Sequence, residues 1–336
     1  VQADGNSCYY LLDCPELFDL GSIYPGGEDE LVRYVLLCRT AALLCDVLDW
    51  QPEILHCHDW HTSLLVARQA AGLESCGPLG DARSVLTIHN IGYQGAFGAA
   101  ALADCGEAAL ADALPREADG LGINLLRAGV RGADAVTTVS PTYADEILTP
   151  QFGMGLEPDL QARSADIIGI LNGADYGVWD PSRDTLIERH YDARDSSGKR
   201  DCRADLMRSL GLGLPDDVPI AGVVSRLVEH KGIDLLLGAL PGLVASGRLA
   251  LAILGDGDDE LATGLEDLVA RFPERVGFSR GYDDPLAHRI IAGSDLFLVP
   301  SRYEPCGLTQ MYALRYGTVP VVRKTGGLAD TVSHFD

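Results

Sequence analysis

Short, continuously apolar runs alternate with amphipathic segments along most of the chain. In the first half, apolar runs predict strands at residues 54–59, 84–89 and 135–140. Helices are predicted between these strands, over residues 60–72 and 123–133 and from Pro141 onward. In the second half, strands are predicted at residues 220–225, 249–254, 296–300 and 319–322. Continuously apolar strands linked by helices are typical of parallel sheets covered on both faces, so we predict an α/β protein.

The two series of strands are joined near residues 172–181. A chain of 336 residues also favours two domains over one. We therefore predict two Rossmann-like parallel-sheet domains, residues 1–175 and 176–336, that face each other across a cleft. In open α/β sheets, ligands bind where strands end at their carboxyl edges. Most of the motifs below lie at such an edge.

Composition narrows the classes of partner. The formal charge of −23 argues against binding of nucleic acid, which needs a basic patch on the protein. An anionic substrate could still bind, but only where the protein's few cationic side chains are concentrated in one place. No apolar run approaches the roughly 18 residues that cross a bilayer, so no membrane partner is expected. The nine cysteines are scattered, without a C-x-x-C pair, which is typical of reduced thiols.

The first chemical motif is the segment 225–232, which follows an apolar strand and precedes a helical run. It places Arg226 and Lys231 on a strand-to-helix loop, beside a helix N-terminus that attracts anions. A guanidinium fork and an ammonium together suit a diphosphate leaving group. The alternative is a pair of solvated loop cations.

The second motif is the segment 301–310, again after an apolar strand. Glu304 ends the loop and Gly307 opens the next helix, where a small residue lets backbone N–H groups approach a ligand. A carboxylate beside such donors can accept sugar hydroxyls. Glu304 could instead only cap the helix, and Cys306 alone would more often be a packed thiol.

Together with residues 324–330, these motifs resemble the C-terminal domain of bacterial glycogen synthases and plant starch synthases. That family comprises retaining glucosyltransferases of the GT-B fold, in glycosyltransferase family 5. Segments of the first half resemble family signatures in the family's order: residues 56–61, 87–95, 139–144 and 171–175. The resemblance covers essentially the whole chain.

The resemblance implies transfer of glucose from ADP-glucose to the non-reducing end of an α-1,4-glucan, without a cofactor or metal. It places Asp59 and His89 on the sugar side, and Asn172 on a glucose hydroxyl. Arg226 and Lys231 would stabilise the departing ADP, and Glu304 would bind the glucosyl ring. It also implies contacts with the donor from the backbone of Cys306, Gly307, Leu308 and Thr309, and from Tyr282 near the nucleotide.

Other interpretations of these residues stay open. His89 could be structural, Asp59 a helix cap, Asn172 a turn residue and Tyr282 a core residue. Alternate strand positions share a face, so three histidines could be metal ligands, although no further ligand completes a site: His56, His58 and His61.

The pattern also departs from the family. Its Lys-x-Gly-Gly-Leu loop after the first strand is absent, and residues 9–18 resemble a stretch well downstream of that loop. The chain also stops before the family's terminal helices. We therefore expect a fragment that lacks the start of the first domain and the end of the second. We expect an exposed sheet edge in the first domain. Many relatives with this fold carry a second glutamate eight residues after the first. Here Tyr312 takes that position, with Gln310 nearby, which resembles the synthase group and not the wider family.

Because no nucleophilic carboxylate pair is evident, we expect a same-face, ion-pair-like displacement after donor binding and domain closure. The location expected is the bacterial cytoplasm, or a plastid for a plant or algal chain. Competing functions are a transferase for another sugar nucleotide such as UDP-glucose, and an inactive glucan-binding remnant. A dinucleotide oxidoreductase is the third, but its glycine motif is incomplete because position 260 is Glu.

Overall fold

The computed structural model describes residues 2–4, 7–19 and 26–335, and it divides into two compact units. Unit 1 comprises Val1–Val139 and Ala144–Ile170, and unit 2 comprises Ser140–Tyr143 and Leu171–Asp336. The domain limits predicted from the sequence, 1–175 and 176–336, stay predictions.

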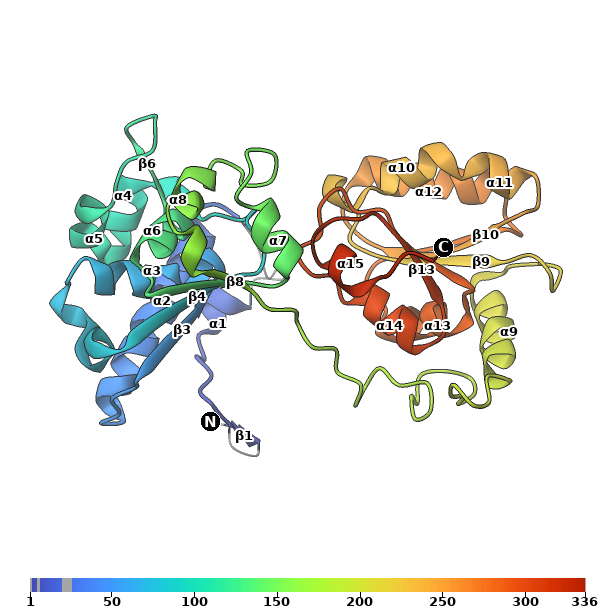
Figure 1. Cartoon of the computed structure of the whole chain (residues 1–336), viewed down its shortest axis with the longest axis horizontal. Coiled ribbons are helices and arrows are strands. Elements are labelled where there is room, and N and C mark those ends of the chain that lie inside the picture. Colours follow the sequence, from blue (N-terminus) through green and yellow to red (C-terminus); the bar gives the residue numbers. More distant parts are fainter. Residues whose placement is uncertain (1, 5–6, 20–25, 336) are drawn as a thin grey trace. The chain divides into compact units, whose positions relative to one another are not determined.

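Unit 1 is built on a parallel four-stranded sheet (Figure 1). Its order is β3 (Ile54–His58), β4 (Arg83–Ile88), β7 (Ala135–Thr138), β8 (Ile167–Gly169). The predicted strands of the first half are thus confirmed. Two small antiparallel pairs accompany the sheet: β1 (Gln2–Asp4) with β2 (Ser7–Tyr9), and β5 (Ala96–Gly98) with β6 (Gly122–Asn124).

The α-helices of the first half are α1 (Pro15–Phe18), α2 (Gly27–Val47), α3 (Asp59–Ala70), α4 (Ala99–Leu102), α5 (Ala108–Ala113), α6 (Leu125–Gly132), α7 (Pro141–Glu146) and α8 (Glu157–Gln161). Helical segments of 3₁₀ type lie at Glu74–Asp81 and Ser164–Asp166, and one of π type lies at Ala103–Glu107. The predicted start of a helix at residue 123 is wrong, because Gly122–Asn124 pairs with β5. Asn124 instead caps α6 by accepting a hydrogen bond from the Arg127 N–H at 2.9 Å.

Unit 2 contains a five-stranded parallel sheet (Figure 1). Its order is β11 (Val276–Arg280), β10 (Ala250–Gly255), β9 (Ile220–Val224), β12 (Leu296–Val299), β13 (Val319–Val322). The helices are α9 (Gly198–Leu210), α10 (Ile233–Ala239), α11 (Pro241–Ala245), α12 (Asp259–Arg271), α13 (Asp284–Gly293), α14 (Thr309–Arg315) and α15 (Gly326–Thr331), with a 3₁₀ turn at Glu229–Lys231. The four predicted strands of the second half are confirmed.

Each face of this sheet has its own buried core, as expected for continuously apolar strands. Ile220 and Phe297 lie in the cluster that includes buried residues of α9, α13 and α14. Ala221 and Val223 lie in the cluster that includes buried residues of α10 and α12. Alternate residues of β9 therefore point to opposite faces.

The order of the strands sets the place where a ligand is expected. From β9 the chain proceeds to β10 and β11 on one side, and then returns to β12 on the other side. The junction between β9 and β12 is therefore the topological switch point of the sheet. Ligands of open α/β sheets bind at the carboxyl ends of the strands at this point.

The first part of unit 2, ahead of α9, packs on α13 and α14 through aromatic rings. Trp179 stacks between His288 and Tyr312, with ring-centroid distances of 3.7 and 4.2 Å. The buried Asp184 accepts hydrogen bonds from His288 Nδ1 at 2.7 Å and from the Tyr316 hydroxyl at 2.5 Å. Burial raises the pKa of Asp184, but these hydrogen bonds outweigh it and hold the pKa below its usual range. These contacts therefore anchor the segment to α13 and α14.

Lys199, near the start of α9, caps the ends of two helices. Its Nζ donates to the carbonyl oxygens of Ala292 and Tyr316 at 3.0 and 3.2 Å, and to Thr318 Oγ1 at 2.7 Å. Ala292 is in the last turn of α13, and Tyr316 follows α14. Cations are favoured at such helix ends. Burial nevertheless lowers the pKa of Lys199 to about 8.

The substitution Lys199→Met is expected to remove the contribution that Lys199 makes to the pH dependence of the free energy of unfolding. An unfolded lysine titrates near pH 10.4, so between about 8 and 10.4 the unfolded chain binds more protons and Lys199 makes stability rise with pH. The difference in unfolding free energy, wild type minus variant, should therefore grow by up to about 3 kcal/mol from about pH 7.5 to 10.5 in urea titrations. The exposed Lys324→Met should show no such growth. A difference for Lys199→Met that is flat with pH would contradict the burial of this charge.

Among the described residues, no helix is both long and apolar enough to cross a bilayer.

Candidate functional site

The loop after β9 carries both predicted phosphate ligands. Arg226 is exposed, and Lys231 ends a 3₁₀ turn before α10. Gly232 follows with a φ of +71°, and a Cβ there would lie 2.4 Å from the Pro300 carbonyl oxygen. The loop therefore lies directly against the end of β12, and only glycine fits at this position.

Lys231 and Glu304 form an ion pair at the switch point. Lys231 Nζ lies 2.6 Å from Glu304 Oε2, and the buried Ser301 hydroxyl donates to the same oxygen at 2.9 Å. The two side chains are only 20% and 8% exposed. Because a charge withdrawn from water needs a partner, each of these side chains is the partner that the other requires. The structure thus brings together the two loops that the sequence singled out.

The pKa of His230 is affected by its burial and by the charged side chains at this edge of the sheet. Its pKa is lowered to about 4, first by burial and then by the charges of Lys231 and Arg226, against the opposing charge of Glu304. The imidazole is therefore neutral at neutral pH. The chain has 26 Lys and Arg residues against 49 Asp and Glu. Arg226 and Lys231, both on this loop, therefore provide the local positive charge that an anionic ligand requires.

The segment after Glu304 is packed against the glycine pair of the third motif. A Cβ at Gly327 would lie 2.2 Å from the Cys306 carbonyl oxygen, and the Gly327 N–H donates to the Glu304 carbonyl at 3.1 Å. Gln310 Nε2 donates to the carbonyls of Cys306 and Gly307 at 3.1 and 2.9 Å. Residues 324–330 therefore support the loop that carries Glu304.

The other residues of the second half that were predicted to contact the sugar nucleotide differ in their burial. Burial raises the pKa of the buried Cys306 thiol, and a hydrogen bond with the Asn172 backbone opposes the rise, so these two residues are neighbours. Leu308 is half-exposed before α14, which begins at Thr309. Tyr282 is 91% exposed between β11 and α13, so its interpretation as a core residue is wrong.

In unit 1, Asp59 supports the loop that carries His89. Asp59 Oδ1 accepts hydrogen bonds from the backbone N–H groups of His89 and Asn90 at 2.7 and 3.2 Å. The first turn of α3 has no side-chain cap, so the interpretation of Asp59 as a helix cap is wrong. Burial raises its pKa, and the two N–H donors oppose the rise. Asp59 adopts a φ of +54°, which is uncommon outside glycine.

Histidines line the same edge of unit 1. His58 Nδ1 and His89 Nε2 share a hydrogen bond at 2.9 Å, and His56 Nε2 shares one with Thr87 Oγ1 at 2.7 Å. The rings of His56 and His58 lie 4.3 Å apart, as alternate strand positions should. Burial, and then the charges of His56 and His89, lower the pKa of His58.

His61 does not join these histidines. Its ring packs against Trp60 and Tyr34 at centroid distances of 4.4 Å, and burial lowers its pKa to about 4. Among the described residues, no group of three or more His, Cys, Asp or Glu side chains is placed to hold a metal.

The substitution Asp59→Ala is expected to destabilise the fold by about 1–3 kcal/mol, because two partly buried N–H groups lose their acceptor. Asp59→Asn keeps an amide oxygen and tolerates the positive φ, so its loss should be smaller. Urea titration measures both. Asp49→Ala is the matched control, since Asp49 also has a positive φ, +48°, but is exposed. Equal losses for Asp59→Ala and Asp59→Asn would contradict the role of this acceptor.

Gly255, which ends β10, and Gly257, two residues later, let neighbouring loops pack closely. A Cβ at Gly255 would lie 2.3 Å from the Ser225 carbonyl oxygen, and one at Gly257 would lie 2.4 Å from that of Leu227. Asp256 pairs with Arg280 at 3.2 Å. These glycines therefore let the loop after β10 approach the loop that carries Arg226. This packing explains the glycines of the incomplete dinucleotide motif, Gly255 and Gly257, without a bound dinucleotide.

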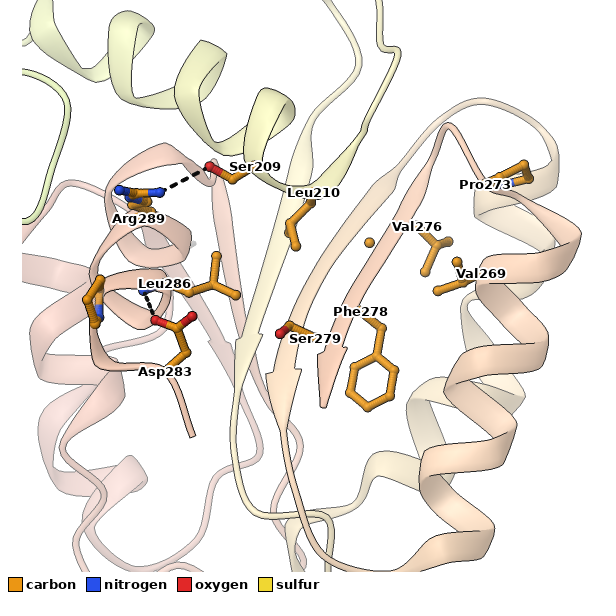
Figure 2. A pocket seen from close by; sticks show the side chains of 12 residues that line it. Ser209, Leu210, Val269, Pro273, Val276, Phe278, Ser279, Asp283, Leu286 and Arg289 are labelled. Atoms are coloured by element: carbon orange, nitrogen blue, oxygen red, sulfur yellow. Dashed lines mark hydrogen bonds between the residues drawn. The ribbon is translucent and has the colours of Figure 1, made fainter. Parts of the chain in front are cut away.

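A separate pocket of about 630 Å³ lies beside the edge strand β11 (Figure 2). Its walls come from β11 and the helices around it, including Leu210, Phe278 and Leu286. Its polar members are engaged in the fold: Asp283 accepts from the Leu286 N–H at 2.9 Å, and Arg289 donates to the Ser209 hydroxyl at 3.4 Å. None of the predicted site residues lines it.

Several residues of the site were not predicted. Ser301 and Arg302 lie in the segment 301–310, and Gly327 in the segment 324–330, but the sequence assigned none of them a role. Asp234, in the helical run after Gly232, had no assigned role either. The position of Ser301, three residues before Glu304 on the same loop, is the one signal that could have suggested a contact with this carboxylate.

Two family models match the chain. The model described as "Starch synthase catalytic domain" matches residues 2–162, and "Glycosyl transferases group 1" matches residues 211–336. Among curated proteins, glycogen synthase 2 of Nitrosococcus oceani is 44% identical over 339 residues, covering 98% of this chain and 67% of that protein. The glycogen synthase of Yersinia pestis is 47% identical over 340 residues, covering 96% and 68%. The chain thus spans about two thirds of the length of these relatives.

Solved structures agree with the sequence comparison. The catalytic domain of starch synthase IV from Arabidopsis thaliana, bound to ADP and acarbose, superposes with a TM-score of 0.87 at 35% identity, covering 95% of this chain and 66% of that one. A sucrose-phosphate synthase from Thermosynechococcus elongatus, with a TM-score of 0.57 at 20% identity, shares the fold. The chain therefore belongs to the glycogen and starch synthase family, the GT-B glucosyltransferases that transfer glucose from ADP-glucose to an α-1,4-glucan.

Proposed function

We propose that this chain transfers glucose from ADP-glucose to the non-reducing end of an α-1,4-glucan with retention of configuration. The observation that carries the proposal is the Lys231–Glu304 pair, 2.6 Å apart at the junction of β9 and β12. This is the place in an open α/β sheet where a nucleotide ligand is expected. The relatives support the same donor and acceptor.

The cations have the chemistry for the leaving group. An ammonium has three donors, and Lys231 uses one on Glu304, so the others can face a diphosphate. Arg226 adds a guanidinium on the same loop. As ADP departs, charge develops on the phosphate oxygen, and preorganised cations stabilise this charge in the transition state.

Glu304 has the chemistry for the sugar. Its carboxylate accepts from Lys231 and Ser301, and a carboxylate has about four lone-pair sites in all. We assign it to glucosyl hydroxyls, with Asn172 beside Cys306 as a further hydroxyl ligand. We also assign contacts with ADP-glucose to the backbone of residues 306–309 and to Tyr282, as the family resemblance implies.

The transfer we propose is a same-face displacement. The bond between the anomeric carbon and the phosphate oxygen breaks, and ADP leaves with the electron pair. The 4-hydroxyl oxygen of the glucan forms the new bond on that face, and its proton passes to the departing phosphate. We assign His89 to the transferred glucose, with Asp59 and His58 holding its loop and ring. Because the curated relatives are bacterial, we infer a cytoplasmic setting.

Incorporation of labelled glucose from ADP-glucose into glycogen tests this function, with glucan binding measured in parallel. Label is expected in the polymer from ADP-glucose and much less from UDP-glucose. Preference for UDP-glucose would support a related transferase. Glucan binding without incorporation would support an inactive binding remnant, and binding of neither glucan nor ADP would reject the proposal.

A further inference from the structure

Arg302 connects the two loops that carry Lys231 and Glu304. Its Nη1 donates to the Glu229 carbonyl and to Asp234 Oδ1, both at 2.7 Å, and its Nη2 donates to Asp234 Oδ2 at 2.6 Å. Its backbone N–H donates to the His230 carbonyl at 2.7 Å. One residue of the loop after β12 thus makes four hydrogen bonds to residues 229–234.

The neighbours of the reactive pair also contact each other. The His230 ring, next to Lys231, stacks on the Tyr303 ring, next to Glu304, at a centroid distance of 4.8 Å. Asp234 lies in the first turn of α10, so Arg302 also fixes the start of that helix. The fork of arginine on a carboxylate is directional as well as strong, and lysine cannot reproduce it.

We propose that Arg302 is a positioning residue for glucosyl transfer, which keeps Lys231 aligned with Glu304 by clamping their loops together. This inference rests on the proposed function. The guanidinium is engaged with Asp234, so it acts through the loops and not on the donor. Lysine has a flexible stem, and a catalytic group displaced by about 1 Å can lose about 100-fold in rate.

The alternative is an ordinary surface ion pair. The side chains of Arg302 and Asp234 are 34% and 44% exposed, and such pairs typically contribute little to stability. A purely structural pair would therefore change stability slightly and leave turnover unaffected. Positioning predicts the reverse, a loss of turnover larger than the loss of stability.

The chain contains a matched control at the opposite end of the same two strands. Arg203 Nη1 donates to Asp295 Oδ2 at 2.6 Å, and its Nη2 bonds the Val218 carbonyl. Asp295 Oδ2 also accepts from the Ile220 N–H, so this pair joins the amino ends of β9 and β12. Arg203 and Arg302 thus make the same kind of contact, but Arg302 lies beside the candidate site and Arg203 lies away from it.

The test compares Arg302→Gln and Asp234→Asn with Arg203→Gln in the full chain. The first two should each lower kcat for incorporation by about 10- to 100-fold, with little change in KM for ADP-glucose. The double variant should be no slower than either alone. Arg302→Lys should fall between wild type and Arg302→Gln. Arg203→Gln should cost at least as much stability in urea and leave kcat near the wild-type value.

Combination with Lys231→Ala separates positioning from a general effect. Arg302→Gln should slow the wild type but not the Lys231→Ala variant, which has no ammonium left to align. An equal further loss in that background, or an unchanged kcat in Arg302→Gln, would overturn the proposal. A wild-type chain without incorporation would reject the proposed function instead. ADP affinity, measured by calorimetry, would then test Arg302 separately. ADP already carries the charge that would develop only during transfer, so a misaligned Lys231 should weaken ADP binding in Arg302→Gln but not in Arg203→Gln, even where KM for ADP-glucose changes little.

Discussion

Replacing Lys231 by alanine is expected to lower kcat for glucose incorporation by about 100- to 1,000-fold, the usual effect of removing one preorganised charge-stabilising group. The ammonium would act mainly on charge that develops as ADP departs, so KM for ADP-glucose should change much less. The free energy of unfolding should fall by no more than about 1–3 kcal/mol, because Glu304 keeps its hydrogen bond from Ser301. Steady-state kinetics and urea titration measure the two effects.

Arg248→Ala is the control for the loss of a cation, since Arg248 is exposed after α11. It should leave kcat near the wild-type value. Losses of turnover and stability in equal proportion for Lys231→Ala would show that the residue is structural, and the assignment of this lysine to the leaving group would fail.

Replacing Gly327 by alanine is expected to disturb both fold and activity. The added Cβ would lie 2.2–2.6 Å from three backbone atoms of Cys306, which cannot move aside as a side-chain end can. Overpacking of this kind typically costs about 1–3 kcal/mol, and here it displaces the backbone that leads from Glu304 into α14. A lower urea midpoint and a loss of incorporation should therefore appear together.

Gly238→Ala is the matched control. Gly238 lies within α10, and a Cβ there has nothing within 4 Å. Alanine should stabilise this helix by about 0.5–1 kcal/mol and leave kcat unchanged. A Gly327→Ala variant as stable and active as wild type would contradict the close packing of this motif under the Glu304 loop.

The sequence pattern predicted the parts of the site that follow from strand order. Apolar runs located β9 and β12, and the polar residues after each run marked their carboxyl ends. Since parallel strands end at one edge, Lys231 and Glu304 were expected to converge although 73 residues separate them. The family resemblance then supplied their chemical roles.

What escaped prediction depends on contacts between side chains and distant backbone. Periodicity does not show that Arg302 reaches Asp234, or that the Asp59 carboxylate serves the His89 loop instead of its own helix. Residues 122–124 fit a helical pattern, and only pairing with β5 makes them a strand. Tyr282 has the hydrophobicity of a core residue, yet its place on a loop leaves it exposed.

The stacking of Trp179 on His288 and Tyr312 also provides an optical probe. The chain has three tryptophans, and the other two, Trp50 and Trp60, belong to unit 1. Replacing those two with phenylalanine would leave a single emitter whose fluorescence the adjacent imidazole can quench. Because Tyr312 lies on α14, directly after the Glu304 loop, any loosening of that helix on ADP-glucose binding would uncover one face of this indole to water and shift its emission to the red. Ligand-linked motion of unit 2 could thus be followed in real time without an attached dye.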